Sequence, residues 1–111
     1  MQDTIPLPRR QLPPLAHVTQ LLTQDHINDV RAETQQRLLQ SGFLNSLKPD
    51  AQIGITAGSR GMGSFVELIT GIVNAVKAKG GRPFLIPAMG SHGGATEEGQ
   101  TEILRRLGIT E

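Results

Sequence analysis

The sequence contains no cysteine, no tryptophan and no tyrosine, and only three of its 111 residues are phenylalanine. The lack of cysteine excludes disulfides, thiolate catalysis and metal sites built on thiolates. The low aromatic content excludes a platform for stacking bases, and the near balance of 11 basic against 10 acidic residues provides no basic face for a nucleic acid. We therefore expect no DNA or RNA partner.

Long apolar runs are lacking as well. No segment approaches the roughly 18 apolar residues of a membrane-spanning helix, and the first residues contain no apolar stretch of signal-peptide length. The composition therefore predicts a soluble protein that does not bind membranes. A cytoplasmic location is expected, since a chain without cysteine fits a reducing compartment.

Glycine is abundant, with 13 residues, and it marks two consecutive units of strand, loop and helix. In the first unit, the apolar run Ile53–Thr56 predicts a buried strand, and a glycine-rich loop follows it. Ser64 and Glu67 have the spacing of a capping box and predict a helix over Phe65–Lys79. The residues of this helix expected to pack against a sheet are Leu68, Ile69, Ile72 and Val76.

The second unit repeats this order. Phe84–Ile86 is the predicted strand, with Pro87 at its exit or on a bulge, because proline cannot donate a ladder hydrogen bond. A loop over Met89–Ala95 leads to a helix whose N-cap is Thr96. The inward-facing residues of that helix are Ile103, Leu104 and Leu107. Because each strand feeds a helix of crossover length, the two strands are expected to be parallel neighbours.

The region before these units is less regular. Met1–Leu15 holds four of the seven prolines and is expected to be an extended arm, followed by a short strand over Ala16–Leu22. A helix is predicted from Asp25 to Gly42, with Ile27 on its apolar face. The fold class expected for residues 16–111 is α/β, a Rossmann-like parallel sheet with crossover helices. Two or three strands leave such a sheet incomplete, so the remainder of the domain is expected in a missing C-terminal part.

The two glycine-rich loops follow the carboxyl ends of neighbouring strands, which is where open α/β sheets bind ligands. Strands about 4.8 Å apart bring Arg60 and His92 within the length of a small substrate. Arg60 offers a planar fork to a carboxylate or phosphate, and His92 is a proton-transfer group among bare glycine backbone. The simpler alternative is a tight turn with a solvated arginine. His17 and His26 are expected at the surface.

Two resemblances compete for these loops. Thr56–Gly63 looks like the dinucleotide loop of short-chain dehydrogenases, with its first glycine displaced by one position. A closer resemblance is carried by GITAGSRG at 54–61, KGGRPF at 79–84 and PAMGSHGGAT at 87–96. These motifs resemble the N-terminal domain of the lactate racemase family, nickel pincer-nucleotide enzymes that racemise or epimerise 2-hydroxy acids. The match covers most of this chain and about the first quarter of a full-length family member.

The resemblance implies that His92 is one of two catalytic histidines, which deprotonates the substrate hydroxyl while the C2 hydride moves to the cofactor. It also implies that Arg60 helps to hold substrate or cofactor anions. The further residues that it assigns to the binding of substrate or cofactor are Ser59, Gly61, Gly90, Ser91, Gly93, Gly94 and Thr96. The implied cofactor is the nickel pyridinium bis-thiocarboxylate mononucleotide. Its anchoring lysine, the second catalytic histidine and the nickel-ligand histidine are expected outside this chain.

The sequence departs from lactate racemases proper at their Asp-x-Thr-Arg-Pro loop. Ala57 and Ser59 stand at the Asp and Thr positions, Gly61 replaces the proline, and Gly93 replaces an arginine after the histidine. These differences suggest a divergent isomerase acting on a 2-hydroxy acid other than lactate. The 111 residues alone are expected to be inactive and to bind no nickel. The alternatives are a nicotinamide-binding dehydrogenase fragment and a non-catalytic module that binds a phosphate or nucleotide.

Overall fold

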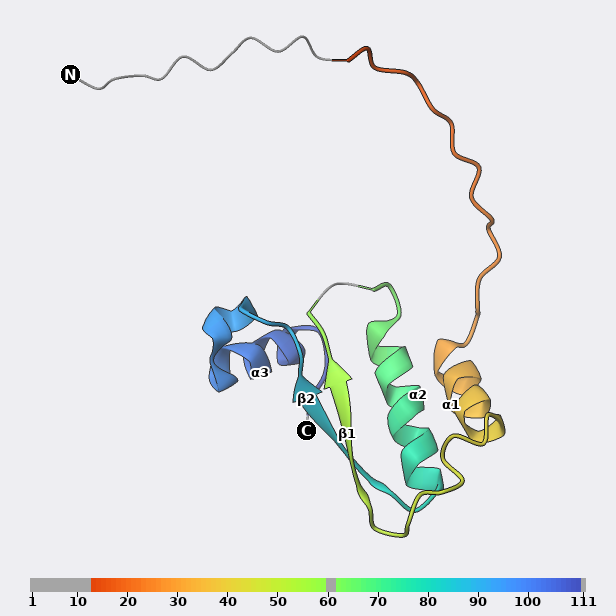
Figure 1. Ribbon diagram of the computed structural model, residues 1–111, viewed down its shortest axis with the longest axis vertical. Helices are drawn as coiled ribbons and strands as arrows, with labels where there is room; N and C mark the ends of the chain where they lie inside the picture. The colour runs from red at the N-terminus through yellow and green to blue at the C-terminus, as the bar shows by residue number, and fades with distance from the viewer. Residues whose placement is uncertain (1–12, 60–61, 111) are drawn as a thin grey trace, which may run out of the picture.

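The computed structural model describes residues 13–59 and 62–110 as a mixed α/β structure with a two-stranded parallel sheet (Figure 1). Arg60 and Gly61 lie outside the described residues. No helix in the described ranges is long and apolar enough to cross a membrane. In chain order the elements are α1 (Val30–Gln40), β1 (Gln52–Ala57), α2 (Phe65–Ala78), β2 (Arg82–Pro87), the short 3₁₀ turn η1 (His92–Ala95) and α3 (Glu97–Arg106).

The two strands pair in parallel, as the sequence predicts, in a register that runs from Gln52 opposite Arg82 to Ala57 opposite Pro87. Each strand is longer than predicted because the apolar runs Ile53–Thr56 and Phe84–Ile86 are extended by flanking residues. Pro87 is the last residue of β2, which confirms that it lies at the exit of the strand. The next N–H, that of Ala88, donates to the Ala57 carbonyl at 2.7 Å, so the pairing continues past the proline.

Helices α2 and α3 both contribute to the apolar core on one face of the sheet. Ile69 and Val76 of α2 are buried as predicted, whereas Leu68 and Ile72 are only half-buried. The cause is their position beside β1, where they line the walls of open cavities. The buried residues of this cluster are Ile55, Ala57, Phe65, Ile69, Met89 and Leu104.

Helix α1 packs side by side with α2 (Figure 1). The contact is close at the buried Gly71, where a Cβ atom would lie 2.6 Å from the Arg31 carbonyl oxygen and 2.8 Å from Thr34 Cβ. A second cluster beneath this contact joins Leu44 to Ala75 and Val76. The absence of a side chain at Gly71 is therefore what allows the two helices to approach.

The strand predicted over Ala16–Leu22 is absent, and residues 13–26 form no regular secondary structure. This segment extends away from the sheet (Figure 1), and Leu15, Val18 and Leu21 are 100%, 84% and 92% exposed. A strand requires a pairing partner for its backbone groups, and among the described residues β1 and β2 pair only with each other. The apolar residues of this segment were therefore not sufficient to make it a strand.

Two helix starts also differ from the prediction. Helix α1 begins at Val30 instead of near Asp25, because the Asp29 carboxylate caps it by accepting the Ala32 N–H at 2.9 Å. Ile27 consequently lies outside the helix and is 51% exposed. At α2, Ser64 is the N-cap, but its side chain makes no capping hydrogen bond, so the predicted capping box does not form.

The unequal burial of α2 gives a first prediction. Ile69→Ala is expected to lower the free energy of unfolding by about 2–5 kcal/mol, because its side chain is enclosed and its removal leaves a cavity. Ile72→Ala is expected to cost less, about 1–2 kcal/mol, since part of its side chain already contacts solvent. Urea unfolding followed by circular dichroism measures both values. Equal losses would contradict the burial described for α2.

Gly71 gives a second prediction, which is decided by the sign of the change in the free energy of unfolding. Glycine to alanine inside a helix ordinarily stabilises it by about 0.8–1 kcal/mol. Gly71→Ala is expected to destabilise the protein instead, because the new methyl group meets the backbone of α1. Lys77→Ala, at an exposed position of the same helix, is the control and should change stability by less than about 0.5 kcal/mol. A stabilised Gly71→Ala variant would show that α1 does not pack closely on α2.

Candidate functional site

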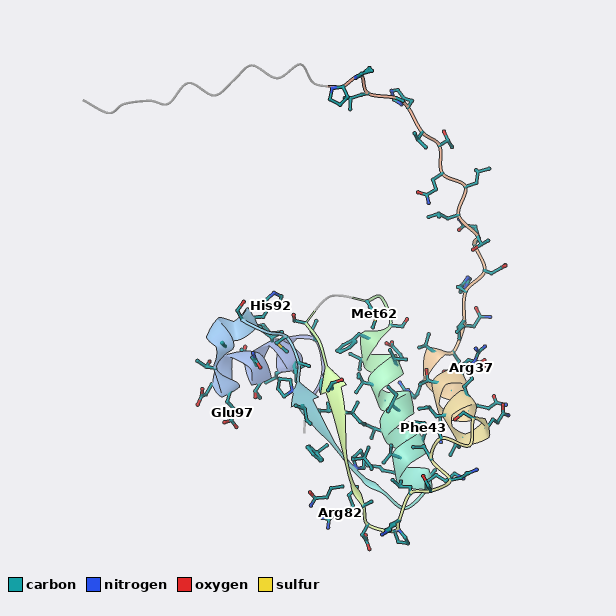
Figure 2. The ribbon with its side chains drawn as sticks, viewed as in Figure 1. Arg37, Phe43, Met62, Arg82, His92 and Glu97 are labelled. Carbon is teal, nitrogen blue, oxygen red and sulfur yellow. The ribbon has the colours of Figure 1, made fainter. Side chains whose placement is uncertain are left out.

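The loops after β1 and β2 meet at the carboxyl end of the sheet. The Ser59 hydroxyl and Nδ1 of His92 form a hydrogen bond between side chains that are 33 residues apart in the sequence. Figure 2 shows His92 at the end of the molecule opposite Arg82, the residue with which β2 begins. The parallel strands therefore bring together the two motifs that the sequence singles out.

The loop that carries His92 has an unusual backbone. Gly90, Gly93 and Gly94 have φ values of 60°, 63° and 69°, in the left-handed region that glycine adopts without a steric penalty. Ala95 also lies there, with φ of 56°. Glycine at these positions therefore sets the course of the loop and the position of its histidine.

Hydrogen bonds from α3 and its N-cap residue hold the loop that carries His92. The Gln100 side-chain amide donates to the carbonyl oxygens of Gly90 at 2.8 Å and of His92 at 3.3 Å. The Thr96 hydroxyl caps α3, as predicted, by accepting the Gly99 N–H at 3.1 Å, and it donates to the Gly93 carbonyl at 3.1 Å. Gln100 was missed by sequence reasoning. The sequence feature that could have identified Gln100 is a single amide side chain one helical turn after the N-cap residue Thr96.

Loop and helix also approach each other through glycine. A Cβ atom on Gly93 would lie 2.5 Å from the Gly99 carbonyl carbon, and one on Gly99 would overlap the Gly93 carbonyl oxygen. Gly94 has a similar φ, but nothing lies within 4 Å of its hypothetical Cβ. Gly93 and Gly99 are therefore required by close backbone contact, which holds the loop against the helix.

A cavity of about 540 Å³ opens beside this pair of loops. Its polar wall includes Ser59 and His92. Met62, which lies shortly before α2, is 55% exposed (Figure 2). The apolar wall of the cavity is formed by Met62, Phe65, Leu68, Ile69, Ile72, Ala88 and Met89. An apolar wall with a few convergent polar groups is common in small-molecule sites, and this cavity combines the two while remaining open to solvent.

His92 is the one ionisable side chain among the described residues that line this cavity. Charge is concentrated elsewhere, on the exposed face of α3. There, hydrogen bonds from Arg106 and Arg105 lower the pKa of Glu102 below its usual value. Without a carboxylate in the described wall, the cavity offers no repulsion to an anionic ligand.

The cavity wall combines the apolar residues Phe65 and Met89 with the polar side chains of Ser59 and His92, which are the kinds of group that an aromatic ring with polar substituents contacts. A metal ion would require ligand side chains of its own. Within residues 13–59 and 62–110, no group of three or more His, Cys, Asp or Glu side chains is placed to hold a metal ion. The described residues therefore supply no ligand set for nickel.

The other residues assigned by the resemblance have structural positions. Gly90, Gly93 and Gly94 shape the His92 loop, Ser91 is exposed at the start of η1, and the Thr96 hydroxyl is engaged in capping α3. Arg60 and Gly61 lie outside the described residues, so the expected proximity of Arg60 to His92 stays a prediction. His17 and His26 are exposed and far from the cavity in sequence, which confirms their expected surface location.

The chain was compared with protein-family models, curated proteins and solved structures, and none of them matches it. The lactate racemase resemblance consequently rests on the three motifs alone. In the structure, the hydrogen bond between Ser59 and His92 joins the first of these motifs to the third.

The two glycines of the His92 loop give a third prediction. Gly93→Ala and Gly94→Ala share the cost of placing a Cβ in the left-handed region, roughly 1–2 kcal/mol. Gly93→Ala is expected to cost about 1–3 kcal/mol more, because its methyl group also meets the backbone of α3. Guanidinium unfolding of the two variants measures the difference directly. Identical losses would mean that the loop does not contact Gly99.

Proposed function

We propose that this chain forms the N-terminal part of an isomerase that racemises or epimerises a 2-hydroxy acid, as lactate racemases do. The observation that carries the proposal is the meeting of Ser59 and His92, from two separate motifs, at the wall of one cavity. The imidazole is exposed, so a substrate can reach it. The proposal includes a Rossmann-like completion of the sheet and a cytoplasmic location.

In this mechanism His92 is the base for one substrate enantiomer. Its imidazole accepts the proton of the C2 hydroxyl, and the C2 hydrogen leaves with the electron pair of its bond, so that the substrate becomes a 2-keto acid. Return of the hydrogen to the other face of the planar carbonyl, with a proton given back to the oxygen, inverts the centre. Proton transfer of this kind needs the base within hydrogen-bonding distance of the hydroxyl, and an exposed imidazole at the cavity wall meets that requirement.

The nickel pincer nucleotide, when bound, supplies the acceptor that takes the C2 hydrogen and returns it. The residues of this chain that would hold the organic part of that group are Phe65, Met89 and Ser59 in the cavity wall. Arg60, which follows Ser59 in the sequence, is assigned by the resemblance to the anionic groups of substrate or cofactor.

The fourth prediction tests His92 in the enzyme expressed from its whole reading frame and loaded with cofactor. His92→Ala is expected to lower the racemisation rate by at least about 100-fold, because the base for one enantiomer is removed. Chiral chromatography of a panel of 2-hydroxy acids, each started from one enantiomer, measures the rate. Nickel content and circular dichroism should be unchanged.

His26→Ala is the matched control, since it removes an exposed histidine from outside the cavity and should leave the rate unaltered. Near-normal turnover by His92→Ala would reduce His92 to a loop residue and favour the non-catalytic binding module. Reduction of a nicotinamide cofactor without racemisation would favour the dehydrogenase.

A further inference from the structure

The bond between Ser59 and His92 carries an inference that rests on the proposed function. Ser59 is half-buried, and its hydroxyl contacts the imidazole through Nδ1. No hydrogen bond to Nε2 is formed by the described residues. The described residues thus engage one ring nitrogen, Nδ1, and form no hydrogen bond to the other.

We propose that Ser59 is a positioning residue, whose hydroxyl oxygen accepts the Nδ1–H of His92 and thereby keeps Nε2 unprotonated as the base. A neutral imidazole has one N–H donor and one acceptor nitrogen, and the partner of one nitrogen determines which tautomer is present. A serine hydroxyl oxygen can accept the Nδ1–H, because it carries two acceptor lone pairs.

This arrangement also suits both directions of the reaction. The proton of the C2 hydroxyl moves to Nε2, which makes the ring a cation with two N–H groups. Nδ1–H continues to donate to Ser59, so no second proton has to move. When the proton returns to the substrate oxygen, the ring is again neutral with its proton on Nδ1. Ser59 holds the ring in one orientation through both states.

Backbone contacts make the ring position reproducible. The carbonyl of His92 is held by Gln100, and the close approach of Gly93 to Gly99 fixes the residue that follows. On the other side, Ser59 directly continues the segment in which Ala57 is fully buried and paired with β2. The two side chains therefore meet from two anchored backbones.

The test is nitrogen NMR of the 111-residue chain with ¹⁵N-labelled histidine. At a pH where the ring is neutral, couplings between ring nitrogens and carbon-bound protons distinguish the two tautomers, and His92→Gln assigns the signals. Wild type is expected to show His92 with its proton on Nδ1, whereas an imidazole free in water favours Nε2. Ser59→Ala should shift His92 toward the tautomer protonated on Nε2, and Ser59→Thr should restore the wild-type signals. Ser46→Ala, at an exposed serine outside the cavity, is the control.

A wild-type spectrum with the proton on Nε2, or one that Ser59→Ala does not alter, would overturn the proposal. The wild-type measurement decides the question even if Ser59→Ala fails to fold. In the cofactor-loaded enzyme, Ser59→Ala should lower kcat roughly tenfold with KM nearly unchanged, and Ser59→Thr should recover most of it. Absence of racemisation with an intact tautomer effect would refute the proposed function and leave the role of Ser59 standing. Racemisation without a tautomer effect would refute the role of Ser59 and leave the proposed function standing.

Discussion

The parallel pairing of β1 with β2 is the constraint on which the rest of this structure depends. Its register places Ala57 opposite Pro87, so the two chain segments leave the sheet at the same edge. An antiparallel pairing would send the two loops to opposite ends of the strands. The hydrogen bond from the Ala88 N–H to the Ala57 carbonyl extends the pairing to the last position before the loops. Contact between Ser59 and His92 is a direct consequence.

Close backbone contacts at glycine hold the elements around this sheet. Gly71 allows α1 to approach α2, Gly93 and Gly99 allow the His92 loop to lie against α3, and a Cβ on Gly81 would lie 2.7 Å from Leu47 Cδ2. A side chain at any of these positions would push a neighbour away. Glycine therefore serves packing here as well as loop geometry, and the position of His92 depends on it.

The core lies on one face of the sheet, and this determines where a cavity can form. On the opposite face, Phe84 and Ile86 remain 48% and 41% exposed, and their side chains lie over Gly54. On the covered face, α2 leaves Leu68 and Ile72 half-buried beside β1. The cavity next to Ser59 and His92 is bounded by that incompletely covered side of α2.

Much of this arrangement follows from local sequence patterns. The two apolar runs, the amphipathic spacing of α2 and the Thr96 cap were all predictable, because each depends on interactions between residues close in the chain. The candidate site was predictable to the extent that both loops had to follow parallel strands. His92 was identified by its glycine neighbours.

Other features were decided only by the tertiary structure. The sequence of Ala16–Leu22 fits a strand, yet no strand within residues 13–59 and 62–110 pairs with it. The capping box at Ser64 has the right spacing, but the backbone there, with φ of −124° and ψ of 39°, does not place the hydroxyl to accept. The hydrogen bond of Ser59 joins it to a residue 33 positions away, and no local pattern encodes such a contact. The sequence by itself determined the apolar runs of both strands and the apolar face of α2, whereas packing between elements decided which side chains meet, because that depends on distances set by the whole fold.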